Sequence, residues 1–192
     1  MIYHSSSPDE TMAIARDMAK NARAGDIIAL SGDLGAGKTV FVKGFAEGLG
    51  VKGIINSPTF TLMQIYDDGR LPIYHFDLYR LMDASYDDID IDTLEEIGFF
   101  EYMDGDEASS GAGVCLIEWA EYARGFIPDS AIWVELRRTD KADKSDKADK
   151  LGESDKSGEV CKFTKANKTD YIEGEKEDGS FEKRRKIHIR GL

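Results

Sequence analysis

The spacing of apolar residues over the first 50 positions predicts a helix, a buried strand and a second helix. Apolar side chains recur every three or four residues over 12–22, behind the capping box Ser7-Pro8-Asp9-Glu10, which has proline at the first helical position. Residues 27–30 are apolar throughout, as in a strand buried on both faces. Helical spacing returns from 38 to about 49, and Gly50 suits the left-handed position after a helix.

The middle of the chain predicts a hairpin, a helix and two more strands. Residues 60–66 and 71–79 have strand character on either side of Asp68-Gly69, which predicts a turn between antiparallel strands. The spacing of apolar residues predicts a helix around 91–102. A fully apolar strand is expected at 114–117 and a further strand at 131–136. Because buried strands alternate with helices, we expect an α/β fold with a mostly parallel sheet and an inserted antiparallel hairpin.

The pattern changes abruptly after Arg138. An Asp-Lys repeat of period three follows, which matches neither a helix nor a strand and offers almost nothing to bury. We therefore expect a core over 1–138, a charged, disordered insertion over 139–180 and a terminal edge strand over 181–192 that returns to the core.

Composition and charge narrow the class of protein. A chain of 192 residues with 41% apolar content is long enough for one well-buried domain. No apolar run approaches membrane-spanning length and no signal peptide is visible, so we expect a cytoplasmic protein. Cys115 and Cys161 lack metal-ligand spacing and are expected to be buried or idle thiols. The net charge of −12 originates in residues 1–138, which argues against independent nucleic-acid binding.

The segment GDLGAGKT, residues 32–39, matches G-x-x-x-x-G-K-[ST] at every fixed position, after a predicted strand and before a predicted helix. Its glycines allow backbone N–H groups to point inward and form an anion nest at the helix N-terminus. Lys38 is placed to bridge β- and γ-phosphates, and the hydroxyl of Thr39 to hold magnesium. An ordinary glycine turn is the alternative. The context favours a nucleoside triphosphate site.

Two acidic residues end apolar strands. Glu118 resembles the acidic residue that closes a Walker B strand, and Asp77 ends the strand before it. Metal binding and water positioning are the functional hypotheses for this pair. The structural alternatives are that Asp77 pairs with Arg80 and that Glu118 caps a turn.

Three further features stay open on sequence alone. The loop Ser57-Pro58-Thr59 either senses the γ-phosphate or only starts a strand. Trp119 either stacks on a base or partner, or is packed in the core. Asn167-Lys168-Thr169-Asp170 spells a guanine-reading pattern, but it lies in a charged segment and not at the end of an apolar strand, which disfavours a GTPase.

Five motifs follow one another along the chain: GDLGAGKT (32–39), SPTFTL (57–62), YHFDLYRL (74–81), EEIGFFEY (95–102) and LIEWAE (116–121). Together, in this order, they resemble the TsaE family of small bacterial P-loop ATPases. The resemblance implies a three-layer α/β/α P-loop NTPase fold and a role in forming N6-threonylcarbamoyladenosine in tRNA. It further implies ATP and Mg²⁺ as cofactors and the proteins TsaD and TsaB as partners. Contact with tRNA is expected only through that complex, and contact with membrane or DNA is not expected.

The resemblance also assigns site residues. Lys38 and Thr39 match the phosphate lysine and magnesium threonine, Glu118 matches the magnesium glutamate, and Asp77 matches the aspartate that positions water, although either carboxylate remains a candidate for that task. The expected nucleotide contacts are Glu10, Thr11, Asp33, Leu34, Gly35, Ala36, Gly37, Lys38, Thr39, Trp119 and Arg185. Hydrolysis is expected to be weak without partners. A nucleotide-gated binding module and a small-molecule kinase are the alternative functions.

Overall fold

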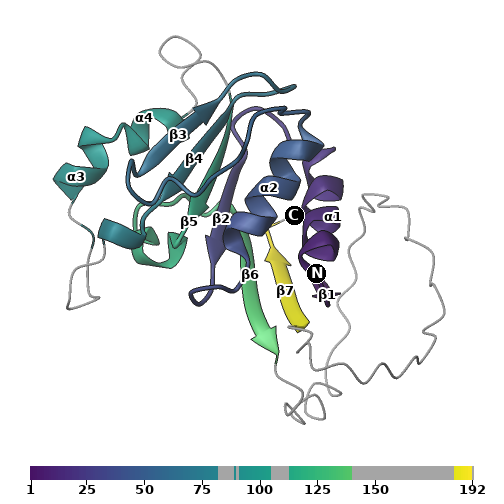
Figure 1. Ribbon diagram of the computed structural model, residues 1–192. Coiled ribbons are helices and arrows are strands. Elements are labelled where there is room, and N and C mark those ends of the chain that lie inside the picture. Colours follow the sequence, from purple (N-terminus) through teal and green to yellow (C-terminus); the bar gives the residue numbers. More distant parts are fainter. Residues whose placement is uncertain (82–88, 90, 105–112, 140–183, 192) are drawn as a thin grey trace, which may run out of the picture.

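The computed structural model describes residues 1–81, 89, 91–104, 113–139 and 184–191, which form one mixed β-sheet with helices on its two faces (Figure 1). The strand order is β1-β7-β6-β2-β5-β4-β3. The strands are β1 Ile2–Ser5, β2 Ile27–Ser31, β3 Met63–Tyr66, β4 Ile73–Asp77, β5 Val114–Glu118, β6 Ile132–Thr139 and β7 Arg184–Arg190. The α-helices are α1 Pro8–Ala19, α2 Lys38–Gly48, α3 Ile91–Glu96 and α4 Phe99–Asp104, and the 3₁₀ helices are η1 Tyr79–Leu81 and η2 Ala120–Ala123.

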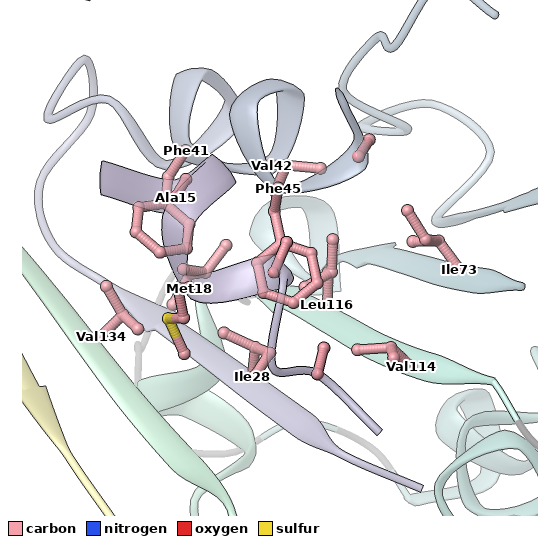
Figure 2. Close-up of a cluster of buried hydrophobic side chains, with 14 of the residues drawn as sticks. Ala15, Met18, Ile28, Phe41, Val42, Phe45, Ile73, Val114, Leu116 and Val134 are labelled. Atoms are coloured by element: carbon pink, nitrogen blue, oxygen red, sulfur yellow. The ribbon is translucent and has the colours of Figure 1, made fainter. Parts of the chain in front are cut away.

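The central strands β6, β2, β5 and β4 are parallel and their alternating side chains separate two cores. One core lies under α1 and α2, as Figure 2 shows, and the other lies against α3, α4 and η2. The first contains Ala15, Met18, Phe41, Val42 and Phe45 from the helices and Ile28, Ile73, Val114, Leu116 and Val134 from the strands. The expected three-layer α/β/α arrangement is therefore confirmed.

The inserted hairpin is confirmed, but its turn is wider than predicted. Strands β3 and β4 are antiparallel and Tyr66 pairs with Ile73, so six residues connect them and not a two-residue turn at Asp68-Gly69. The Arg70 guanidinium donates to the carbonyls of Ala19 and Ala22, at 3.0 and 2.9 Å. These contacts fasten the loop to the end of α1.

The expectation of a terminal edge strand is wrong. Strand β7 lies between β6 and β1, and it is antiparallel to both. The edge is occupied by β1, which the sequence analysis did not predict because this strand is short and mostly exposed. Pairing with β1 satisfies the outer hydrogen bonds of β7, and the side chains of Ile187 and Ile189 are buried in the core.

The single helix expected at 91–102 is two helices. Gly98, with φ of 71°, separates α3 from α4, and this left-handed backbone ends the first helix. The bend lets both Leu94 and Phe99 enter the core completely. Helical spacing alone does not reveal such a break.

Helices α1 and α2 pack so closely that Gly44 has no room for a side chain. A Cβ atom there would lie 2.3 Å from the Met12 carbonyl oxygen. Gly44→Ala is therefore expected to lower the free energy of unfolding by about 2 kcal/mol, although alanine favours helices. Urea denaturation measures this change. Gly125→Ala is the control because nothing lies within 4 Å of its Cβ position. Equal stabilities of the two variants would contradict the close packing.

Candidate functional site

The glycine-rich segment leaves β2 and enters α2, as predicted, and its backbone demands glycine. Gly32, Gly35 and Gly37 have φ of 132°, 75° and 109°. A Cβ atom on Gly32 would lie 2.2 Å from the carbonyl oxygen of Leu136 in β6. The conformation is therefore a compact loop at a helix N-terminus, the local geometry that binds anions.

The ammonium group of Lys38 lies within this loop. Nζ donates to the carbonyl oxygens of Gly32 and Asp33, at 2.5 and 3.1 Å, and lies 3.4 Å from the ring centroid of Trp119. Burial lowers the pKa of Lys38, and nearby carboxylates, Glu121 foremost, oppose this effect. A buried cation held mainly by neutral groups favours an arriving anion, because an anion provides stronger charge compensation.

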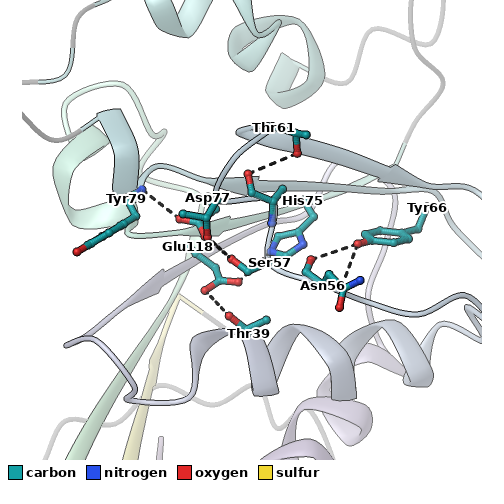
Figure 3. Close-up of polar contacts among 11 residues, drawn as sticks. Thr39, Asn56, Ser57, Thr61, Tyr66, His75, Asp77, Tyr79 and Glu118 are labelled. Atoms are coloured by element: carbon teal, nitrogen blue, oxygen red, sulfur yellow. Dashed lines mark hydrogen bonds and ion pairs between the residues drawn. The ribbon is translucent and has the colours of Figure 1, made fainter.

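Thr39 and Glu118, the two expected metal ligands, are in direct contact (Figure 3). The Thr39 hydroxyl donates to Oε2 of Glu118 at 2.9 Å, and Oε1 of Glu118 lies 3.0 Å from Nε2 of His75. A hydroxyl and a carboxylate are hard oxygen donors of the kind that magnesium prefers. The donor set therefore fits Mg²⁺ shared with phosphate oxygens.

Asp77 binds the loop that precedes the hairpin. Its Oδ2 accepts hydrogen bonds from the hydroxyls of Ser57 and Thr59, the latter at 2.7 Å, and Oδ1 accepts from the backbone N–H of Tyr79 at 3.1 Å. The alternative pairing with Arg80 is not observed, because that guanidinium lies over the ring of Phe60, 5.4 Å from its centroid. The loop at 57–59 is therefore joined to the Asp77 carboxylate by direct hydrogen bonds.

Strand order explains why these residues converge. The loop follows the carboxyl end of β2, and Glu118 and Asp77 end the parallel strands β5 and β4. Asp77 and Glu118 are register partners across β4 and β5. In open α/β sheets, ligands bind at this edge.

Arg185 approaches the loop from β7. Its side chain is buried and Nε donates to the Ala36 carbonyl at 2.9 Å. Burial, and next the charge of Arg138, lower the pKa of Arg185. Arg138 is the register partner of Arg185, and its Nη1 would lie 3.7 Å from a Cβ atom on Gly35. Two arginines therefore flank the loop, and sequence analysis found only one of them.

Trp119 is packed and not presented to a base. Its exposed fraction is 9%, and its ring lies near Lys38, Tyr79 and Tyr122. The residue has φ of 62°, which turns the chain sharply after β5. Of the two hypotheses, the structure favours packing, and the ring adjoins the Lys38 ammonium.

Glu10 and Thr11 form hydrogen bonds with residues that precede α1. The Ser7 hydroxyl accepts from the Glu10 N–H at 3.1 Å, and the Glu10 carboxylate accepts from the Ser6 N–H at 2.6 Å. Thr11 is buried and lies 2.6 Å from the Ser5 hydroxyl. The helix cap is confirmed, and nucleotide contact by these two residues stays a prediction.

Sequence analysis missed two site residues, His75 and Glu121. Oε1 of Glu121 accepts from the Gly32 N–H at 3.2 Å, and burial raises the pKa of this carboxyl. Both residues lie inside motifs that were recognised, YHFDLYRL and LIEWAE. A polar residue in an otherwise apolar strand was the available signal for His75.

The remaining predictions concern thiols, the insertion and membranes. Cys115 is buried, and burial raises its pKa to about 12, so the thiol stays protonated. Cys161, the guanine-reading pattern at 167–170 and the insertion at 139–180 lie outside the described residues. Among the helices that are described, none has both the length and the apolarity to cross a membrane.

Comparisons with known proteins identify the family of this chain. The family described as "Threonylcarbamoyl adenosine biosynthesis protein TsaE" has a sequence model that matches residues 5–147, which include every site residue above except Arg185. The chain is 46% identical over 132 residues to "tRNA threonylcarbamoyladenosine biosynthesis protein TsaE" of Bacillus subtilis, covering 69% of this chain and 74% of that protein. The Treponema pallidum protein of the same name is 44% identical over 113 residues, covering 59% and 73%.

A solved structure supports the same conclusion for the fold. The crystal structure of Bacillus subtilis YdiB is similar with a TM-score of 0.57 and 38% sequence identity, covering 73% of this chain and 78% of that chain. The expected P-loop α/β fold is therefore confirmed.

Proposed function

Because the chain belongs to the TsaE family, we propose that it binds and hydrolyses ATP with Mg²⁺ in support of N6-threonylcarbamoyladenosine formation in tRNA. The contact between Thr39 and Glu118 beside the glycine loop is the observation that carries this proposal. A hydroxyl and a carboxylate are oxygen donors of the kind that Mg²⁺ prefers, and their position next to the loop supports a role in holding Mg²⁺ beside bound phosphates.

Each site residue then has a task. The N–H groups of the loop bind phosphate oxygens, and Lys38 exchanges the carbonyls of Gly32 and Asp33 for them. Bound Mg²⁺ supplies charge neutralisation. Arg185, whose Nε already donates to the loop carbonyl of Ala36, adds positive charge on the β7 side. Asp77, or else Glu118, orients the attacking water.

Partners complete the proposal. We expect turnover to be slow for the chain alone and to rise when TsaD and TsaB dock, with tRNA contacted only through that complex in the cytoplasm. Leu34 at the tip of the loop is 72% exposed, and Phe60 after the Asp77-bound segment is 85% exposed. Exposed apolar side chains beside a phosphate site are consistent with docking of a protein partner there.

Tryptophan fluorescence tests nucleotide binding directly. The chain has two tryptophans, so Trp133→Phe leaves Trp119, whose ring adjoins the Lys38 ammonium, as the only reporter. Titration with ATP and Mg²⁺ is expected to give a saturable change, since phosphate draws the ammonium away from the ring. The double variant with Lys38→Ala is the control. Absence of any saturable signal, together with no binding heat in calorimetry of the unmodified chain, would rule out the proposal.

A nucleotide-gated binding module is the second candidate function. The hydrogen bonds from Ser57 and Thr59 to Asp77 favour it, because they link the loop conformation to a residue at the phosphate site. In that case the bound nucleotide, and not its hydrolysis, controls the partner. The Asp77 variants described in the Discussion separate the two functions.

A further inference from the structure

Resting on the proposed function, we propose that His75 is the positioning residue of the magnesium site: its Nε2–H holds one oxygen of Glu118, so the other oxygen faces Thr39. None of the roles assigned above to the loop, Asp77 or Glu118 includes this histidine.

The placement of His75 is unusual for a polar side chain. The residue is completely buried in β4, on the sheet face that also carries Ile73, Val114 and Leu116. Asp77 and Glu118 lie on the same face because the side chains of a strand alternate. Burying an imidazole in this apolar surrounding is costly unless it makes a specific hydrogen bond. Here Nε2 of His75 lies 3.0 Å from Oε1 of Glu118.

The hydrogen-bond pattern identifies which ring nitrogen carries the hydrogen. Glu118 already accepts the Thr39 hydroxyl through Oε2, and an ionised carboxylate can only accept. The 3.0 Å contact between Oε1 and Nε2 therefore requires a hydrogen on Nε2. Among the described residues, Nδ1 of His75 has no hydrogen-bond partner. Within the described residues, the ring therefore hydrogen-bonds through Nε2 alone, and its partner is Glu118.

This arrangement fixes the rotation of the carboxylate. The hydrogen bond between His75 and Oε1 opposes rotation of the Glu118 carboxylate, and so favours the 2.9 Å contact of Oε2 with the Thr39 hydroxyl. Groups that hydrogen-bond metal ligands set the orientation of those ligands, and their loss lowers metal affinity about 10- to 100-fold. The expected role of His75 is therefore to preorganise Glu118 before Mg²⁺ arrives.

The test measures how much Mg²⁺ strengthens ADP binding, as the ratio of dissociation constants in EDTA and in Mg²⁺. For His75→Leu we expect this ratio to fall about 10-fold, with ADP affinity in EDTA almost unchanged. His75→Gln keeps a side-chain N–H donor and is expected to retain most of the ratio. Phe76→Leu is the matched control, since it alters a fully buried neighbour on the opposite face of β4.

Each outcome decides between the two proposals. A wild-type protein that binds no nucleotide contradicts the proposed function. A wild-type protein with a clear Mg²⁺ effect that His75→Leu leaves intact contradicts only the role of His75, as does an equal loss in Phe76→Leu. Should His75→Leu fail to fold, ¹⁵N resonances of His75 in the unmodified chain decide. Hydrogen on Nε2 alone or on both nitrogens supports the role, and hydrogen on Nδ1 alone overturns it.

Discussion

Replacing Lys38 with alanine is expected to lower kcat/KM for ATP hydrolysis by about 100- to 1,000-fold, the usual effect of removing one preorganised donor from a site of developing negative charge. The reason is specific to the position. The ammonium is buried within the loop, and the carbonyls of Gly32 and Asp33 hold it at the place where phosphates are expected. Solvent cations cannot replace a charge at such a site.

The measurement is phosphate release at saturating and at limiting ATP, with TsaD and TsaB present. Lys43→Ala is the matched control, since Lys43 lies on the same helix, four residues beyond Thr39, and is only partly buried. Its activity is expected to remain within about twofold of wild type, as for a surface substitution. Near-normal hydrolysis by Lys38→Ala would contradict phosphate binding by the loop, and with it the proposed function.

Asp77→Asn is expected to lower kcat by about 100- to 10,000-fold while nucleotide binding persists, if Asp77 is the general base. The substitution preserves size and can still accept the N–H of Tyr79, but its amide nitrogen cannot accept the hydroxyls of Ser57 and Thr59. A loss of activity could therefore arise from the chemistry or from release of the loop.

A second variant separates these causes. Ser57→Ala with Thr59→Ala leaves the Asp77 carboxylate in place and removes the two hydroxyls that bind it. If this double variant keeps most of the activity that Asp77→Asn loses, Asp77 acts in the chemical step. If both are equally impaired, Asp77 acts by anchoring the loop. If Asp77→Asn keeps its activity and Glu118→Gln loses it, the residue that positions the water is Glu118 and not Asp77.

The same variants distinguish the two candidate functions. An energy-coupled role requires that threonylcarbamoyl modification of tRNA fails when hydrolysis fails. Reconstitution with TsaD, TsaB and Asp77→Ala measures this. Undiminished modification without ATP turnover would favour the nucleotide-gated binding module.

The elements that could be predicted from sequence are those governed by neighbouring residues. The cap at Ser7, the buried run in β2 and the left-handed Gly50 depend on interactions within a few positions, and all three are observed. The loop at 32–39 was predictable from its own sequence for the same reason, because its glycines can adopt the positive φ that the structure shows. Local chemistry was sufficient for these features.

Features that depend on distant partners were missed. Strand β1 has little apolar character of its own, and it forms because β7, about 185 positions away, offers a free edge. His75 and Glu121 become site residues only when strand order brings them to Glu118 and Gly32. Trp119 was ambiguous because its burial depends on Lys38 and Tyr79 arriving from two other elements.

The position of β7 between β6 and β1 has a consequence for biosynthesis. Among the strands that the structure describes, β7 is synthesised after all the others, yet it provides both the inner neighbour of β1 and the arginine that contacts Ala36. While Arg184–Arg190 are still inside the ribosome, β1 lacks its partner strand and the loop lacks the Arg185 guanidinium. The full set of contacts around the loop should therefore become available only after β7 has emerged, which limits nucleotide capture by shorter nascent chains.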